Sequence, residues 1–266
     1  MIVDDGMNWM TREVPGPLAR LWRLPVDNKL GRPAALDVER VVATAVELAD
    51  RDGLAGATLP KIAAVLGVTP MSLYRHIGSK QELLGLMADA GLGAPPHLSA
   101  GPWRSMVRDW ARAQLQVHRA RPWLTQLPIT GPPSGPHNVA WMDAGLRALR
   151  ETALDWPAKV GALMVVSGYV REAFVTARQL EQARAAVDLD PATALHDYSR
   201  HLRGLVDPEE LPDMAALLAS GLFDTIEPTD ADPDLDFAFG LDLVLDGVAT
   251  AVSAAESGFP PAGRDA

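Results

Sequence analysis

Apolar side chains recur every three or four positions through most of the chain, which is the spacing of helices with one buried face. The alternation of apolar and polar residues that marks a half-buried strand is absent from the sequence. The pattern therefore predicts an all-α protein. In the second part of the chain the expected helices lie at about 103–119, 137–151, 157–184, 191–204, 209–221 and 233–255.

Two short helices are expected first in the segment 35–91. Asp37 can cap the first of them and Gly53 can end it. Thr58 is a candidate cap for the second helix, in which Pro60 is tolerable because it lies in the first turn.

Two further short helices follow. Thr69 is expected to cap the third, with Pro70 at the first helical position, where a missing N–H costs no hydrogen bond. This helix is expected to end near His76. Ser79 and Glu82 have the spacing of a capping box and begin the fourth helix, which we expect to link two domains.

Helix-breaking residues divide the chain into parts. Four prolines interrupt the first 34 residues, and a stretch rich in glycine and proline covers 91–102. The expected parts are an irregular N-terminal extension (1–34), a small helical domain (35–91), a larger helical domain (92–256) and a C-terminal tail (257–266).

Composition excludes several classes of protein. The 266 residues contain no cysteine, which removes disulfides, thiolate metal sites and cysteine nucleophiles. The longest nearly apolar run, 160–170, is shorter than the ~20 residues that cross a bilayer, and no secretory signal begins the chain. We expect a soluble cytoplasmic protein with no membrane partner.

Catalytic patterns are missing as well. The six histidines have no metal-binding spacing, and the sequence contains neither a phosphate-binding loop nor a nucleophile elbow. His196 and His201 are five positions apart, which places them roughly 140° apart around a helix. We therefore expect no metal, no cofactor and no enzymatic activity.

Residues 58–76 fit a helix-turn-helix. Such a motif needs a small residue where its helices cross and a glycine in its turn, and Ala63 and Gly67 meet these requirements. The apolar residues expected between the helices are Ile62, Leu66, Val68 and Leu73. A plain αα-hairpin is the alternative.

The net charge of −10 is distributed unevenly around this motif. Residues 31–90 carry six basic and seven acidic side chains, so most of the negative charge lies beyond residue 90. A near-neutral domain can bind DNA if its cations face the phosphates and its carboxylates face away.

The stretch TPMSLYRHIGSKQELL at 69–84 closely resembles the recognition helix of the tetracycline-repressor (TetR) family. The residues that carry the resemblance are Leu73, Tyr74, His76, Ile77, Lys80 and Leu83. The segment FGLDLVLDGV at 239–248 looks like the dimerisation helix of the same family. The resemblance is clear over the small domain and looser over most of the remaining chain.

The resemblance implies a set of DNA contacts. The implied phosphate contacts are Thr58, Tyr74, His76 and Lys80, with Lys61 as a further expected contact. The residues implied to face the major groove are Thr69, Pro70, Met71, Ser72 and Arg75. Hydroxyl, phenol, imidazole and ammonium groups suit phosphate oxygens, and the first side chains of a helix that enters the groove lie nearest the bases. The alternatives are Tyr74 as a core aromatic, His76 as a surface histidine and Lys80 as a solvated lysine.

The operator is expected to differ from that of the tetracycline repressor. That protein carries a base-reading arginine in its second helix where this chain has Pro60. Arg75 is the one long cation in the recognition helix, where it can read guanine or hold a phosphate. Arg32 can lie in the minor groove or belong to a disordered linker.

The last long helix is apolar on two faces, one with Leu241 and Val248 and another with Phe239 and Leu243. One face can meet the core of its own subunit and the other a second subunit. The expected dimerisation residues are Leu163, Val166, Val170, Leu241, Val244, Val248 and Val252. A buried central helix in a monomer is the alternative.

Five tryptophans fall between 103 and 156, in helices that the resemblance implies enclose an effector pocket. The expected ligand-binding residues are Trp110, His118, His137, Asn138, Trp141, Met142, Tyr169 and Phe174. Each tryptophan can alternatively be core packing.

The sequence thus predicts a three-helix helix-turn-helix DNA-binding domain followed by a larger helical bundle for ligand binding and dimerisation. The function expected from the resemblance is a ligand-responsive repressor that binds a palindromic operator as a homodimer and is released by a small, mostly apolar effector. The alternative is a helical adaptor or ligand-binding protein with little DNA binding.

Overall fold

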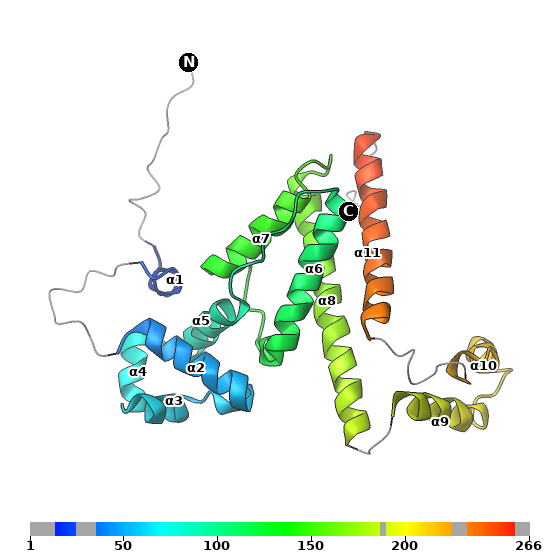
Figure 1. The fold of residues 1–266 in the computed structure, drawn as a ribbon, viewed down its shortest axis with the longest axis horizontal. Coiled ribbons are helices and arrows are strands. Elements are labelled where there is room, and N and C mark those ends of the chain that lie inside the picture. The colour runs from blue at the N-terminus through cyan, green and yellow to red at the C-terminus, as the bar shows by residue number, and fades with distance from the viewer. Residues whose placement is uncertain (1–13, 25–35, 187–189, 225–232, 259–266) are drawn as a thin grey trace. The chain divides into compact units, whose positions relative to one another are not determined.

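The structure is a computed structural model that describes residues 14–24, 36–186, 190–224 and 233–258. Within these ranges the regular elements are helices and none is a strand, which confirms the all-α prediction. The chain divides into two compact units, residues 1–151 and residues 152–266 (Figure 1).

Four helices and one short 3₁₀ turn enclose the core of the helix-turn-helix region in the first unit. Their bounds are α2 (Val38–Asp52), η2 (Leu54–Gly56), α3 (Leu59–Leu66), α4 (Pro70–Ile77) and α5 (Lys80–Leu92). The Asp37 carboxylate caps α2 by accepting from the Arg40 amide at 2.8 Å, as predicted. Val41, Ile62 and Leu73 are completely buried between the helices.

The first unit continues past the predicted domain break. Its later elements are α6 (Trp103–Ala120), η3 (Pro122–Gln126) and α7 (Pro136–Ala148). Both η3 and α7 contact α5, and α6 contacts α7. Trp123 and Leu127 are buried in the helix-turn-helix core. Side chains from beyond residue 91 therefore complete this core.

The prediction of an irregular extension over residues 1–34 is wrong for part of that segment. Gly16–Leu21 forms a short helix, α1, with Pro15 at its N-cap and Pro17 in its first turn. Proline is tolerated there because the first N–H groups of a helix have no partner within it. α1 contacts α5, and Leu21 packs against the helix-turn-helix core. The predicted minor-groove residue Arg32 lies outside the described residues.

The second unit consists of two groups of helices. α8 (Trp156–Ala185) packs along α11 (Pro233–Glu256). α9 (Pro191–Arg203), α10 (Pro212–Ala219) and η4 (Leu222–Asp224) pack on one another. These bounds lie within a few residues of those predicted from the sequence.

The predicted dimerisation residues occupy a different face from the one expected. Leu163, Val166, Val170 and Leu241 are at most 1% exposed, Val248 and Val252 are also buried, and Val244 is half-buried. These side chains lie on two helices that pack together within one protomer, so a second subunit cannot reach the buried ones. The other apolar face of α11 is the exposed one, with Phe239 at 70% and Leu243 at 57%.

α8 and the segment Asp234–Glu256 of α11 are long and apolar enough to cross a membrane, judged by length and composition alone. The uninterrupted apolar runs in the sequence did not predict this, because polar residues interrupt both helices. The core helix of a soluble protein meets the same criterion.

Candidate nucleic-acid interface

Local hydrogen bonds build the turn between α3 and α4. Gly67 has a φ of 68°, a left-handed conformation that glycine adopts without strain. The Gly67 amide donates to the Ala64 carbonyl at 3.3 Å, and the Val68 amide donates to the Ala63 carbonyl at 3.0 Å. The Thr69 hydroxyl then caps α4 by accepting from the Ser72 amide at 3.3 Å. The turn and the cap of the recognition helix are therefore as predicted.

Thr58 departs from the prediction in one respect. It stands at the N-cap position of α3, but its side chain makes no capping hydrogen bond. Its hydroxyl is therefore not committed to the helix end, and the residue is exposed. This arrangement is compatible with a hydrogen bond to a phosphate oxygen.

α4 has one buried and one exposed face. Leu73 and Ile77 are completely buried, whereas Met71 is 73% exposed. Tyr74 is 40% exposed, which rules out the alternative that it is a core aromatic. Arg75 is exposed and makes no ion pair or hydrogen bond within the part of the chain that the structure describes. The exposed face thus presents a thioether, a phenol and an unpaired guanidinium.

Two of the predicted groove-facing hydroxyls interact with each other. The Thr69 and Ser72 side-chain oxygens lie 2.9 Å apart in a hydrogen bond. Pro70 is exposed between them but offers no polar group. Met71 and Arg75 are consequently the predicted base-reading side chains that make no hydrogen bond or ion pair with the part of the chain that the structure describes.

Basic side chains stand on both sides of α4. Lys61 is exposed on α3, and Lys80 is exposed as the first residue of α5. His76 is half-buried in the last turn of α4. The Ser79 hydroxyl caps α5 by accepting from the Glu82 amide at 3.1 Å, which fixes the start of the helix that carries Lys80. Tyr74, His76 and Lys80 therefore lie on helices whose first turn is capped by a side chain.

Two predicted effector contacts lie in the core of the first unit. Trp110 and Trp141 are 3% and 5% exposed. The Trp110 indole donates to the Trp141 carbonyl, and the Trp141 indole donates to the Gly93 carbonyl, each at 2.9 Å. Both indole N–H groups are thus already satisfied by the backbone. This geometry favours packing, the alternative considered for each tryptophan, over ligand recognition.

His137 and Asn138 were also predicted to bind the effector, but they contact a buried carboxylate. Asp89 of α5 is 4% exposed and accepts hydrogen bonds from the Asn138 amide at 3.0 Å and the Asn138 side chain at 3.1 Å. The His137 Nδ1 atom lies 3.1 Å from the other carboxylate oxygen. A Cβ at Gly135 would collide with Asp89, so glycine is required there for this close approach. Asp89 therefore joins α5 to the start of α7.

The sequence analysis missed Asp89 as a functional candidate. Its only signal was a single carboxylate among the apolar residues expected on the inner side of a helix. Such a residue needs partners when it is buried. The sequence could not name those partners because they lie almost 50 positions away.

α6 presents a second group that the sequence analysis missed. The Gln114 amide nitrogen is buried and has no hydrogen-bond partner among the described residues. The half-buried His118 follows one turn later on the same face of α6. The predicted residue Met142 is half-buried on α7, which packs against α6. A buried polar group without a protein partner is the kind of group that a ligand or a water molecule satisfies.

The remaining predicted effector residues belong to the second unit. The Tyr169 hydroxyl donates to the Phe237 carbonyl at 2.9 Å, and the two rings stack with centroids 5.6 Å apart. Burial raises the pKa of the Tyr169 phenol, and the negative charge of Asp236 raises it further. Tyr169 therefore joins α8 to α11, which is a packing role that the prediction did not foresee. Phe174 is buried on α8.

Comparison with known families matches both parts of the chain. Residues 41–87 match bacterial regulatory proteins of the tetR family, and residues 94–252 match the tetracyclin repressor-like C-terminal domain. The first match covers the helices that carry the candidate interface.

Individual proteins show the same similarity. The HTH-type transcriptional repressor DrrR1 of Streptomyces coeruleorubidus is 33% identical over 252 residues, which cover 91% of this chain and 87% of that protein. The tetracycline repressor protein class A from transposon 1721 of Escherichia coli is 29% identical over 223 residues, covering 80% and 91% of the two chains. The crystal structure of the TetR family protein ActR of Streptomyces coelicolor in complex with (S)-DNPA is 25% identical with a TM-score of 0.63, covering 82% and 99%.

Proposed function

Because the chain belongs to the TetR family and is a DNA-binding transcription regulator, we propose that it represses genes by binding a palindromic operator as a homodimer. The observation that carries this proposal is the exposed face of α4. Met71 and Arg75 extend from a helix whose opposite face is completely buried and whose start is capped. A rigid helix with exposed, unengaged side chains is the form in which proteins present residues to the major groove.

Base reading is assigned to Arg75 and Met71. The guanidinium can donate two hydrogen bonds to guanine, and the Met71 thioether can pack on a thymine methyl group. Thr58, Lys61, Tyr74, His76 and Lys80 are assigned to the phosphate backbone because they flank this face with hydrogen-bond donors.

The dimer is assigned to the exposed apolar faces of α8 and α11. Met164, Leu235, Phe239 and Leu243 are each more than half exposed in one protomer. Gly168 and Gly247 have open space where a Cβ would stand, which permits close approach of another helix. Two copies of this helix pair would form a four-helix interface and cover the surface that makes the helices apolar enough for a membrane.

The effector is assigned to the region beside α6. ActR, the relative compared above, is solved in complex with (S)-DNPA. In this chain the buried Gln114 amide, with His118 one turn later, supplies the polar groups that would orient a mostly apolar ligand. The proposed site of action is the cytoplasm, where the chromosome lies.

Selection from a random double-stranded DNA library with the full-length protein tests the proposed function. We expect enrichment of a two-fold symmetric sequence whose half-sites are about 34 Å apart, one turn of the DNA helix. Fluorescence anisotropy with the enriched duplex then measures affinity, and sedimentation measures the mass of the complex. A helical adaptor without DNA binding would enrich no sequence.

Release is tested by adding (S)-DNPA or tetracycline to the protein–operator complex. If either ligand dissociates the complex, Gln114→Ala should raise the concentration needed. Gln126→Ala, which changes an exposed glutamine in η3, is the matched control. An equal response of both variants would remove Gln114 from the effector site.

A further inference from the structure

α1 is too short to be stable as an isolated helix. It has six residues, none of them buried, and an isolated helix of this length does not form in water. Its position against α5 must therefore come from contacts outside the helix.

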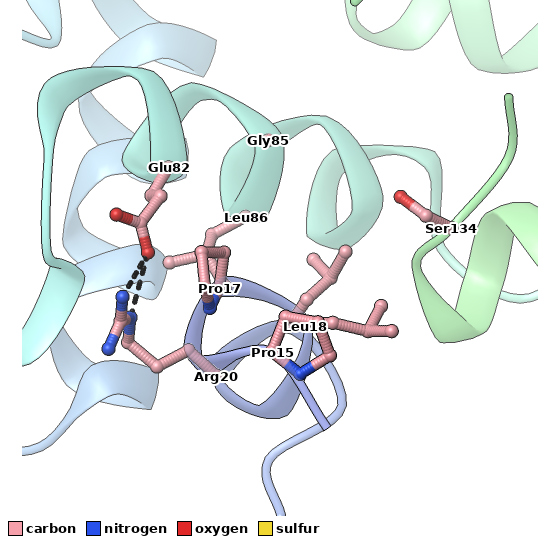
Figure 2. Close-up of a pocket in the computed structure, with 9 residues that line it drawn as sticks. Pro15, Pro17, Leu18, Arg20, Glu82, Gly85, Leu86 and Ser134 are labelled. Carbon is pink, nitrogen blue, oxygen red and sulfur yellow. Dashed lines mark hydrogen bonds and ion pairs between the residues drawn. The ribbon is translucent and has the colours of Figure 1, made fainter. Parts of the chain in front are cut away.

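Apolar packing supplies only part of these contacts. Figure 2 shows Pro15, Pro17 and Leu18 of the α1 segment facing Gly85 and Leu86 of α5. A cavity of about 310 Å³ remains between the two elements. Apolar packing between α1 and α5 is therefore incomplete. Polar contacts also hold α1 in place.

Three polar contacts anchor the segment. The Arg20 guanidinium donates to one Glu82 carboxylate oxygen from Nε at 2.8 Å and also from Nη2 (Figure 2). The Trp22 indole donates to the Ser134 carbonyl at 2.7 Å. Arg23 forms an ion pair with Glu39 of α2.

Arg23 shows how firmly the end of the segment is held. Its φ is 54°, a left-handed conformation that is unfavourable for a residue with a side chain. The guanidinium donates to the carbonyls of Arg20 and Leu21 in addition to its pair with Glu39. Such a conformation persists where surrounding contacts fix it.

The Arg20–Glu82 pair lies against the end of the recognition helix. Gly78 is the C-cap of α4, and a Cβ at Gly78 would come within 2.7 Å of the Arg20 Nη2 atom. Glu82 lies two residues after Lys80, which is assigned to a phosphate. An unpaired carboxylate at this position would repel the DNA backbone.

We propose that α1 is an internal part of the DNA-binding surface, in which Arg20 and Arg23 act as counter-ions for Glu82 and Glu39. This inference rests on the proposed DNA-binding function. Neither arginine needs to touch DNA in this role. Each offsets the negative charge of a glutamate in the helix-turn-helix region, Glu82 on α5 and Glu39 on α2, so that this nearly neutral region can bind a polyanion.

A double-mutant cycle on the full-length protein tests this role. We expect Arg20→Ala to weaken binding of the dimer to the selected operator about 25-fold at low salt, about fivefold for each half-site, the size of one like-charge contact in water. The loss should shrink as salt screens the repulsion. Glu82→Gln should bind at least as well as the parent, and the Arg20→Ala, Glu82→Gln double variant should return to the affinity of the parent.

The matched control is Arg178→Ala, which removes the same charge from a half-buried position on α8. Thermal unfolding followed by circular dichroism checks that each variant is folded. Should Arg20→Ala fail to fold, the parallel cycle of Arg23→Ala and Glu39→Gln provides the test.

The outcomes are distinct. Equal affinity of Arg20→Ala and Arg178→Ala overturns the counter-ion role and leaves the regulator function standing. A loss in Arg20→Ala that Glu82→Gln does not reverse also overturns it, because Arg20 would then contact DNA itself. A parent protein that enriches no DNA sequence overturns both this inference and the proposed function.

Discussion

At the scale of single residues, two cations near the recognition helix are suited to different contacts. Among the described residues Arg75 has no partner and projects from the middle of α4, and Lys80 stands at the first position of α5. A guanidinium can match the two acceptors of guanine, whereas an ammonium acts as a point charge toward phosphate. Specificity and general affinity are therefore expected to reside in different side chains.

Replacing each cation by alanine separates these roles. Lys80→Ala should weaken binding to every duplex and reduce the slope of log affinity against log salt by about 0.9 for each half-site, about 1.8 for the dimer. Arg75→Ala should change the preferred base at one position of each half-site. Repeating the library selection with both variants, together with salt titrations, measures the two effects. A uniform loss in both, with no altered preference, would make Arg75 a phosphate contact.

Tyr169 is expected to give the second unit a pH dependence. Because burial raises the pKa of its phenol in the folded state, the unfolded state releases the proton first, near pH 10. The stabilisation by Tyr169 is complete below about pH 10 and is lost as pH rises through the folded pKa. Tyr169→Phe should weaken this fall in the free energy of unfolding. Urea titrations from about pH 8 to 11, with Tyr198→Phe as control, would contradict this if all three proteins showed the same decline.

At the scale of elements, the junction of α5 and α7 depends on one buried carboxylate. Asp89 accepts hydrogen bonds from two nitrogens of Asn138 and lies beside His137 in a space that Gly135 leaves open. The carboxylate is at the N-terminus of α7, where the helix dipole favours negative charge. The Asp89 side chain therefore connects α5, the helix that follows α4, to α7.

Asp89→Ala should lower the free energy of unfolding by about 2–3 kcal/mol, because it leaves buried donors without an acceptor. Asp143→Ala on the same α7 helix removes an exposed carboxylate paired with Arg147 and should change stability little. Urea unfolding monitored by tryptophan fluorescence measures both variants. Similar small changes in the two would show that the Asp89 contacts contribute no net stability.

At the scale of the whole molecule, the two faces of α11 have different roles. Phe239→Asp places a charge on the exposed apolar face, so it should yield a folded monomer that has lost operator affinity. Val248→Asp places the charge between α8 and α11 and should instead unfold the protomer. Sedimentation velocity and circular dichroism distinguish these results. A Phe239→Asp protein that remains a dimer would exclude this face from the interface.

Local structure followed from the sequence because its causes are local. Asp37, Thr69 and Ser79 each cap a helix through the amide three residues later. Proline and glycine at the ends of helices set the remaining boundaries by backbone sterics. The family resemblance also lay in a continuous stretch, so the exposed face of α4 could be proposed as the DNA-binding face residue by residue.

Tertiary structure decided which apolar face of a helix is buried and which polar side chains become partners. Sequence periodicity showed two apolar faces on α11 but contained nothing to decide which one packs on α8. The partners of Asp89 and Glu82 lie 49 and 62 positions away, beyond the reach of any local pattern. The same holds for Trp110 and Trp141, whose indoles are satisfied by distant carbonyls. Helix ends are fixed by neighbours in sequence, whereas faces and ion pairs are fixed by the relative placement of helices, which only the folded chain determines.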